Sequence, residues 1–513
     1  MRKILLTLIS LVALAALVAC GGGSSSNTTS IPPSPSGGNP GSFSNASFAG
    51  TYVFSVNGVA TGNSFATVGT ITADGNGNIT SGIRDTVNDG GGQTLQTSLV
   101  SGTYSVNQDG RVQAVLKWAN AASGDDTSGQ VIYRFVLQSA SAGKLFEISS
   151  TADATGRIQL QSSNLASTTP LSGTYIVRLD GEDHNNQFPY GAIGGLNFSG
   201  ANIAGTIDEN DNGNVSQQLA LSSGSYAISS GGRGTASYTT SNGTHNFIVY
   251  YVSPSQLELI STDKNFFLHG YADQQTLPVG TTAAFVGDQV FSTSGYDNNG
   301  GGNLSVPVLE TGRLTLTASD AATGSIANAI EDYNDAGVFF TAVAFNGSYS
   351  VAGDGRWTAN FAYPSSNLNL VGWQVSSQQS VVMMTNSNVA NYAILETGTM
   401  RAQTTGLSNS NINGNYAEDL SGFNTTGLGN VETTGSFNAD GNGNLTGFLD
   451  SQSDVSITTD QQQPGSYSVT SNGRSTGAIG SVPVYVYTVD PSTIYLISSD
   501  STRLYQGMLT KQP

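Results

Sequence analysis

The sequence predicts an all-β protein made of four tandem antiparallel meander domains, each with about eight strands. Three observations support this fold class. Apolar residues occur in short runs that alternate with polar residues, which is the pattern of half-buried strands. The connections are rich in Gly, Asn, Asp and Ser, which tolerate the backbone angles of tight turns. Beyond the N-terminal apolar run, no stretch longer than about ten residues shows the 3.6-residue period of a helix.

One segment of the chain recurs four times. It reads GTYSVNQDGR from Gly102, GSYAISSGGR from Gly224, GSYSVAGDGR from Gly347 and GSYSVTSNGR from Gly465. The recurring tyrosines are Tyr104, Tyr226, Tyr349 and Tyr467, and the recurring arginines are Arg111, Arg233, Arg356 and Arg474. Each copy also ends in a glycine followed five positions later by a glutamine, namely Gln161, Gln275, Gln403 and Gln512. The matched spacing predicts one structural unit copied four times.

The recurring side chains have a structural and a functional interpretation. We expect the four tyrosines to lie in the domain cores rather than to form a binding platform. Each arginine follows a glycine at the start of a strand, where it could bond to carbonyls or to a recurring aspartate, or contact a ligand. The structural role is favoured, because a catalytic group is rarely needed in four identical copies. The aspartates recur on the third strand as Asp85, Asp332 and Asp450, and the comparison of copies finds no counterpart in the second.

The landmarks divide the chain after its N-terminal segment into four β repeats. The predicted repeats cover residues 43–165, 166–279, 280–407 and 408–513. Eight strands joined by short turns favour a small closed barrel, which has no free sheet edge. The alternative is an immunoglobulin-like β-sandwich, which needs longer crossovers. A copy opens with a glycine, any residue and a tyrosine, as in Gly50 to Tyr52. This opening weakly resembles the Gly-x-Trp start of lipocalin and related calycin barrels.

The N-terminus has the pattern of a lipidated secretory leader. Arg2 and Lys3 precede an apolar run that ends in LVAC, with Cys20 the one cysteine of the sequence. This ending resembles the lipobox of bacterial lipoproteins, and the whole chain resembles bacterial surface lipoproteins with tandem β repeats. The resemblance implies a signal peptide over residues 1–19, acylation of Cys20 and anchoring in a membrane. Residues 20–42 are then the lipidated cysteine and a flexible tether rich in Gly, Ser and Pro.

Location and partners follow from the leader and the charge. Gly21 after the cysteine points to the outer membrane, on its periplasmic face or at the cell surface. The chain has 17 basic and 35 acidic residues and a net charge of −18, so nucleic acid is not an expected partner. The remaining candidates are a glycan, a small hydrophobic ligand or a protein, bound by a monomer. No cofactor is expected, because phosphate-binding and dinucleotide motifs are missing from the sequence.

The stretch DGNGN occurs at Asp74 to Asn78 and again at Asp440 to Asn444. We interpret it as a hairpin turn between the second and third strands, and align DENDNGN of the second copy with the same turn. A metal loop is the alternative, since Asp208, Asn210 and Asn212 match the first half of a calcium loop. The twelfth position is Leu219 instead of glutamate. No metal site is therefore predicted, and these three residues stay weak candidates.

Catalytic groups are sparse. The three histidines, His184, His245 and His269, all fall in the second copy, and His184 is placed in a long polar loop. There is no Gly-x-Ser-x-Gly motif, zinc-ligand spacing or convincing pair of acids, so we expect no enzyme activity and rank a secreted hydrolase last.

Two functions stay open. The first is a structural, adhesive or interaction role for a membrane-anchored lipoprotein, and the second is the binding of a small molecule or glycan. A barrel that binds a ligand needs an unfilled interior, whereas a structural array can be packed solid. The third copy is the first candidate for binding, because it has Trp357 and Trp373 and a long segment, Ser292 to Gly312, between its first two strands.

Overall fold

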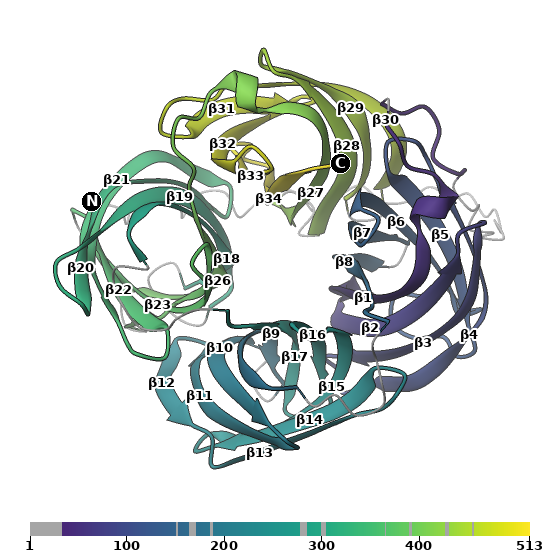
Figure 1. Ribbon diagram of the computed structural model, residues 1–513, viewed down its shortest axis with the longest axis horizontal. Coiled ribbons are helices and arrows are strands. Elements are labelled where there is room, and N and C mark those ends of the chain that lie inside the picture. The colour runs from purple at the N-terminus through teal and green to yellow at the C-terminus, as the bar shows by residue number, and fades with distance from the viewer. Residues whose placement is uncertain are drawn as a thin grey trace, which may run out of the picture. The chain divides into compact units, whose positions relative to one another are not determined.

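The computed structural model describes residues 33–39, 41–149, 152–163, 171–184, 188–276, 285–298, 304–364, 366–388, 392–425, 430–453 and 456–513. The body begins at Ser34 and holds four closed antiparallel barrels. In Figure 1 the strands of each barrel curve around their own axis, from purple and blue for barrel 1 through teal and green to yellow for barrel 4. The predicted all-β fold of four tandem barrels is confirmed, and the sandwich alternative is wrong.

Barrels 1 and 4 are eight-stranded meanders. Barrel 1 follows the short 3-10 helix η1 (Asn45–Ser47) and has strands β1 (Ala49–Ala60), β2 (Asn63–Asp74), β3 (Asn78–Asn88), β4 (Gln93–Val106), β5 (Arg111–Trp118), β6 (Gln130–Ser139), β7 (Ala142–Ile148) and β8 (Ala152–Leu160). Barrel 4 follows η3 (Asn409–Asn411) and has strands β27 (Asn413–Asn424), β28 (Asn430–Asp440), β29 (Asn444–Ser453), β30 (Ser456–Tyr467), β31 (Arg474–Ile479), β32 (Val482–Asp490), β33 (Thr493–Ser498) and β34 (Arg503–Lys511).

Barrels 2 and 3 follow the same plan with one extra strand each. Barrel 2 has strands β9 (Gly173–Asp183), β10 (Phe188–Ser199), β11 (Asn202–Asp211), β12 (Asn214–Ala220), β13 (Ser223–Ile228), β14 (Arg233–Thr240), β15 (Gly243–Ser253), β16 (Gln256–Ser261) and β17 (Phe266–Gln274). Barrel 3 has strands β18 (Gly287–Asp297), β19 (Val306–Ala318), β20 (Thr323–Asp335), β21 (Val338–Val351), β22 (Arg356–Ala362), β23 (Asn367–Ser376), β24 (Gln379–Met384), β25 (Ser387–Asn388) and β26 (Tyr392–Ala402). The sheets close through β9 with β17 and β18 with β26.

Glycines bring the first and last strands of each barrel close together. A Cβ atom on Gly156 of β8 would lie 1.8 Å from the carbonyl oxygen of Ser55, and one on Gly58 of β1 would lie 1.9 Å from that of Asp153. The equivalent close contacts in the other barrels involve Gly181 and Gly270, Gly295 and Gly398, and Gly422 and Gly507. Because any side chain would collide with backbone, these positions explain the glycine that ends every sequence copy.

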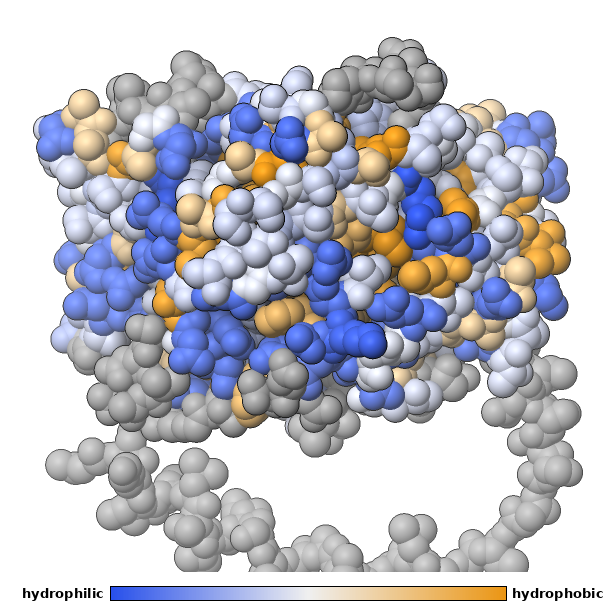
Figure 2. All heavy atoms as spheres, turned by 90° about the horizontal axis from the view of Figure 1, so that it is seen from below, coloured by the Kyte–Doolittle hydropathy of each residue, from blue (hydrophilic) through white to orange (hydrophobic). Residues whose placement is uncertain are grey.

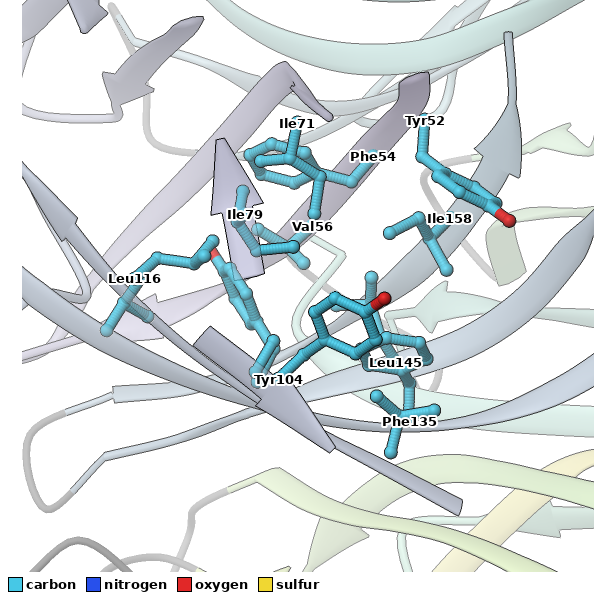
Figure 3. Packing of buried hydrophobic residues seen from close by; sticks show 14 of the residues in the cluster. Tyr52, Phe54, Val56, Ile71, Ile79, Tyr104, Leu116, Phe135, Leu145 and Ile158 are labelled. Carbon is cyan, nitrogen blue, oxygen red and sulfur yellow. The ribbon is translucent and has the colours of Figure 1, made fainter. Parts of the chain in front are cut away.

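Side chains fill the barrels. In barrel 1, residues on alternate positions of the strands point inward, and Figure 3 shows Phe54, Tyr104, Phe135 and Ile158 converging from different strands. The cavities inside barrels 2 and 4 have volumes of about 20 and 10 Å³, which is room for about one water molecule. The interiors are therefore packed cores, with no space for a small-molecule ligand in these two barrels.

The face of the molecule drawn in Figure 2 is mainly polar. On the face drawn in Figure 2, hydrophilic residues predominate and hydrophobic ones are scattered among them. Within the described ranges there is no helix of the length and hydrophobicity needed to cross a membrane. The predicted signal peptide and Cys20 lie outside the described residues, and so do parts of the predicted repeat boundaries.

Candidate functional site

An aspartate forms a β-bulge on the third strand of every barrel. The aspartates are Asp85, Asp208, Asp332 and Asp450, and the strand register shifts at each of them. Each carboxylate accepts a hydrogen bond of 2.6–2.9 Å from a backbone N–H on the fourth strand, donated by Gln96, Gln218, Ala342 and Asp460 respectively. These four donors have φ between 53° and 54°, a conformation that non-glycine residues rarely adopt. The aspartate stabilises the bulge by capping it.

The same aspartates bind the next barrel along the chain. Arg356 of barrel 3 donates two hydrogen bonds to Asp208 of barrel 2, from Nε to Oδ2 at 2.9 Å and from Nη2 to Oδ1 at 2.7 Å. Arg233 donates the same two hydrogen bonds to Asp85, and Arg474 donates them to Asp332. Such two-point contacts between guanidinium and carboxylate are strong and fix orientation. The partner of Arg233, Arg356 and Arg474 is therefore the recurring aspartate of the preceding barrel.

An aromatic donor completes each of these three contacts. The residue that pairs with the arginine on the neighbouring strand is Tyr250, Trp373 or Tyr487. Tyr250 donates to Asp85 at 2.6 Å, Trp373 to Asp208 at 2.9 Å and Tyr487 to Asp332 at 2.6 Å. Each aspartate is completely buried, so these bonds replace the water that the carboxylate loses.

The contact between barrels 4 and 1 closes the cycle with different residues. Val136 stands where the other barrels have an aromatic donor, and Arg134 reaches Asp450 instead, with Nη1 3.3 Å from Oδ2. Arg111 binds the neighbouring Asp460 at 2.5 Å and its own Asp109 at 2.9 Å. The four junctions thus run from barrel 1 to 2, 2 to 3, 3 to 4 and 4 back to 1.

The recurring glutamines at the ends of the copies form a second set of contacts in the same cycle. Gln161 donates to the carbonyl of Tyr251 at 2.7 Å, and Gln403 donates to that of Thr488 at 2.7 Å. Gln275 contacts barrel 3 through the carbonyl of Gln374, and Gln512 contacts barrel 1 through the carbonyls of Asp109 and Leu137. Each barrel therefore ends by binding its successor, and the last one binds the first.

Part of the predicted tether belongs to the folded body. The carbonyl of Ser36 accepts a bond of 2.9 Å from Arg111 of barrel 1. The Asn39 side chain donates to the carbonyls of Ser436 and Thr446 of barrel 4, both at 3.1 Å. This segment spans the one junction that no covalent linker crosses. Ser36 and Asn39, near the end of the tether predicted over residues 20–42, thus contact barrels 1 and 4.

Three of the recurring tyrosines, Tyr104, Tyr349 and Tyr467, are buried in the cores, and Tyr226 is partly buried against its core. The hydroxyls of Tyr104, Tyr226 and Tyr467 donate to the carbonyls of Phe48, Leu171 and Ile412, at 2.8, 3.2 and 2.6 Å. These carbonyls precede the first strand of each barrel, so the tyrosine fixes the point where the chain enters. Tyr349 is also buried and packs against Phe285, with ring centroids 6.0 Å apart.

The structure corrects the alignment of the second copy. The stretch DENDNGN joins the third and fourth strands, β11 and β12, and not the second and third. Asp208 is therefore the counterpart of Asp85, Asp332 and Asp450 that the sequence comparison missed. The DGNGN stretches do form the predicted hairpin turns, in which Asp74 and Asp440 accept bonds from the two asparagines that follow.

The weak calcium candidates serve the junction between barrels 2 and 3. Asp208 binds Arg356 and Trp373, and Asn210 donates to the carbonyls of Met384 and Ile394 at 3.2 and 3.0 Å. Asn212 accepts a bond of 2.8 Å from the backbone N–H of Leu304. In the part of the chain that is described, no cluster of three or more His, Cys, Asp and Glu side chains is arranged to hold a metal.

The candidate ligand-binding tryptophans are both buried, each 1% exposed. Trp357 packs in the core of barrel 3 and Trp373 lies at the junction with barrel 2. The segment between the first two strands of barrel 3 is shorter than predicted, because β18 runs to Asp297 and β19 starts at Val306. A ligand can contact neither indole without displacing protein, so binding by this copy stays a prediction that its tryptophans do not support.

The histidines are also placed differently from expectation. The stretch predicted as a long polar loop is mostly strand, since Gly181 to Asp183 belong to β9 and His184 follows directly. His245 is buried inside barrel 2 beside Tyr238 and Phe266, and burial lowers its pKa. His269 on β17 lines a cavity between the barrels, where burial lowers its pKa as well.

This cavity between the barrels is large enough to hold a ligand. Its volume is about 700 Å³, within the range of small-molecule sites. All four barrels contribute to its wall through the outward faces of their first and last strands, including Gly58, Gly181, Gly295 and Gly422. Hence the closing strands of the barrels both seal the cores and shape the space between them.

Three ion pairs lie in the wall of this inter-barrel cavity, with Arg157 and Glu258 2.6 Å apart, Arg178 and Asp180 2.8 Å apart, and Lys144 and Asp419 3.1 Å apart. The first and third connect different barrels. Thr397 of barrel 3 accepts a bond from Arg178 and donates one to Asp180.

No protein-family model matches this chain, and no curated protein matches it. Among solved structures, it is similar to the isotype 1 transferrin-binding protein B from serogroup B Neisseria meningitidis, with 10% sequence identity and a TM-score of 0.18. That match covers 72% of this chain and 83% of the other. At such a TM-score the likeness carries no argument about function, which has to be inferred from the geometry of this chain.

Proposed function

We propose that this chain is a lipid-anchored protein of the bacterial cell envelope whose four barrels form one rigid structural and interaction body. The observation that carries the proposal is the closed cycle of buried aspartate–arginine contacts between barrels. Domains on a flexible string would keep their polar ends in water, whereas here each barrel buries charged groups that only its neighbour can satisfy. The packed interiors of barrels 2 and 4 also favour a structural role over a ligand held inside a barrel.

The leader sequence supports the place of this body in the cell. A lipid on Cys20 would hold it at the outer membrane, on the periplasmic face or at the cell surface, with the membrane as its first partner. The acidic charge disfavours nucleic acid, and we propose that the chain acts as a monomer because its four junction surfaces are satisfied within one chain. No enzyme activity is proposed.

Calorimetry of the full chain tests whether the four barrels act as one body. We expect one cooperative unfolding transition, since opening any junction leaves a buried aspartate without its arginine. The ratio of calorimetric to van't Hoff enthalpy should be close to one. Several resolved transitions, or a ratio near four, would show independent barrels on a string and contradict the proposal.

The anchor is tested by fractionation of cells that express the full chain. Cys20→Ala should move the protein from the membrane to the soluble fraction, because the thioether-linked lipid can no longer form. The matched control is Ser24→Ala, a similar small change four residues later, which should stay in the membrane fraction. Retention of Cys20→Ala at the level of the unmodified chain would contradict lipidation.

A further inference from the structure

The space between the barrels differs from the space inside them. The inter-barrel cavity has about 700 Å³, whereas the cavities within barrels 2 and 4 have about 20 and 10 Å³. A cavity of that size can surround a ligand of several rings. Its wall mixes hydrogen-bonding side chains with aromatic and aliphatic ones.

The cavity wall offers hydrogen bonds without a net charge. Its three cations are each held by a carboxylate, in the pairs Lys144–Asp419, Arg157–Glu258 and Arg178–Asp180. Of the remaining titratable groups, burial raises the pKa of Glu182 and of Glu432, and it lowers the pKa of His269, so all three are shifted towards neutrality. A charged ligand would have to break one of the ion pairs to gain a partner, whereas a neutral ligand can use them as donors and acceptors.

The four barrels place similar chemistry around the cavity at equivalent positions. We call Gly58, Gly181, Gly295 and Gly422 of the first strands, and the glycines opposite them on the last strands, the seam glycines. The residue before each first-strand seam glycine lines the wall and has a side chain that can form hydrogen bonds: Asn57, Asp180, Ser294 and Ser421. The residue after that glycine is apolar or aromatic in three barrels, as Val59, Tyr296 and Phe423. The rings of Tyr296 and Phe423 contact edge to face, with centroids 6.1 Å apart. Tyr271 lies beneath the guanidinium of Arg157, 4.3 Å from ring centre to Cζ.

We propose that the inter-barrel cavity binds an uncharged, hydroxyl-rich ligand of oligosaccharide size. Hydroxyl groups of such a ligand match the ring of amide, hydroxyl and paired charged groups, and its C–H faces match the aromatic and aliphatic residues that alternate with them. The proposal goes beyond the structural role, since a ring of barrels could hold its shape around a cavity of any chemistry.

Titration calorimetry on the full chain tests the proposal with trisaccharides of matched size. The neutral probes are cellotriose, maltotriose and N,N′,N″-triacetylchitotriose. The charged probes are trigalacturonate and the de-acetylated chitosan trimer. We expect at least one neutral probe to bind, and both charged probes to bind at least tenfold more weakly than that one.

Two cavity variants and one control locate the site. Ser421→Trp places a large ring in the cavity, and Asn57→Ala removes a hydrogen-bonding group without adding volume; each should weaken binding at least tenfold. Ser98→Trp makes the same change at an exposed position on β4 outside the cavity and should bind like the unmodified chain. Melting curves of all three variants establish that they are folded.

Three results would overturn the proposal. They are no heat of binding with any neutral trisaccharide, equal or tighter binding of a charged one, or unchanged binding by both cavity variants. Each of these results leaves the anchoring and cooperative unfolding of the proposed function untouched, so the two proposals fail separately.

Discussion

Replacing Asp208 with alanine is expected to lower the free energy of unfolding by about 3–5 kcal/mol, the cost of leaving a buried charged partner uncompensated. Asp208 is completely buried and accepts bonds from Arg356, Trp373 and the backbone N–H of Gln218. The change therefore removes a cap from the bulge in barrel 2 and leaves Arg356 of barrel 3 without its carboxylate. Urea unfolding followed by circular dichroism measures the loss.

Asp320→Ala is the matched control for Asp208→Ala. Asp320 also accepts backbone bonds, from Ala322 and Thr323, but in an exposed hairpin turn of barrel 3. Its loss should cost much less stability than the loss of Asp208, because its hydrogen bonds lie in a solvated turn. If both variants lose the same stability, the junction between barrels 2 and 3 does not hold the body together.

Stability is also expected to fall as the pH rises from about 5 to about 8. Burial raises the pKa of Glu147 and of Glu418 from 4.5 to about 8, and raises those of Glu331, Glu396 and Glu432 well above 4.5. A raised folded-state pKa means that the folded chain holds the proton more tightly than the unfolded chain. This contribution is complete below pH 4.5 and is lost as the pH passes through about 8. One pKa unit is worth about 1.4 kcal/mol, so the sum amounts to several kcal/mol.

Stability is also expected to fall at low pH. Hydrogen bonds from Asn444 and Asn442 lower the pKa of Asp440 to about 2, and similar bonds lower that of Asp74, so these groups lose their stabilising charge as the pH falls below 3.8. We therefore expect the highest stability between about pH 4 and pH 5.

Glu418→Gln checks the cause of the pH dependence. The amide cannot ionise, so the slope of unfolding free energy against pH between 5 and 8.5 should become smaller. Asp354→Asn, a change from carboxylate to amide at an exposed turn, should leave the slope unchanged. A stability that rises over this pH range in the unmodified chain would contradict the assignment of protonated buried glutamates.

The barrels were predictable from the sequence because their determinants are local. Alternating apolar residues, turn-forming DGNGN and the recurring tyrosines each act within one copy, and each had the expected place in the structure. The seam glycines were visible in the sequence as landmarks. Only the register of β1 against β8 explains them, because it shows that any Cβ atom there would collide with the backbone of the opposite strand.

The junctions were harder to predict, since their aspartate–arginine contacts pair residues that lie from 142 to 349 positions apart and on different barrels. The recurrence of Arg356 and its equivalents gave a signal, and a bond to a recurring aspartate was one of the alternatives. The partner was obscured because DENDNGN resembles DGNGN, so that Asp208 was assigned to a turn. Recognising that Asp208 lies ten residues before Gln218, as Asp332 does before Ala342, would have aligned the copies correctly.

The contact of Gln512 with barrel 1 has a consequence for how many barrels such a chain can hold. In an open solenoid, every added unit finds a docking surface, and the end units need special polar caps. Here the surface of barrel 1 that would receive a newcomer is already occupied by barrel 4 and by Ser36. An engineered fifth copy would therefore have to break the contacts between barrels 4 and 1 or remain undocked, much as a closed ring of subunits has no free surface for another member.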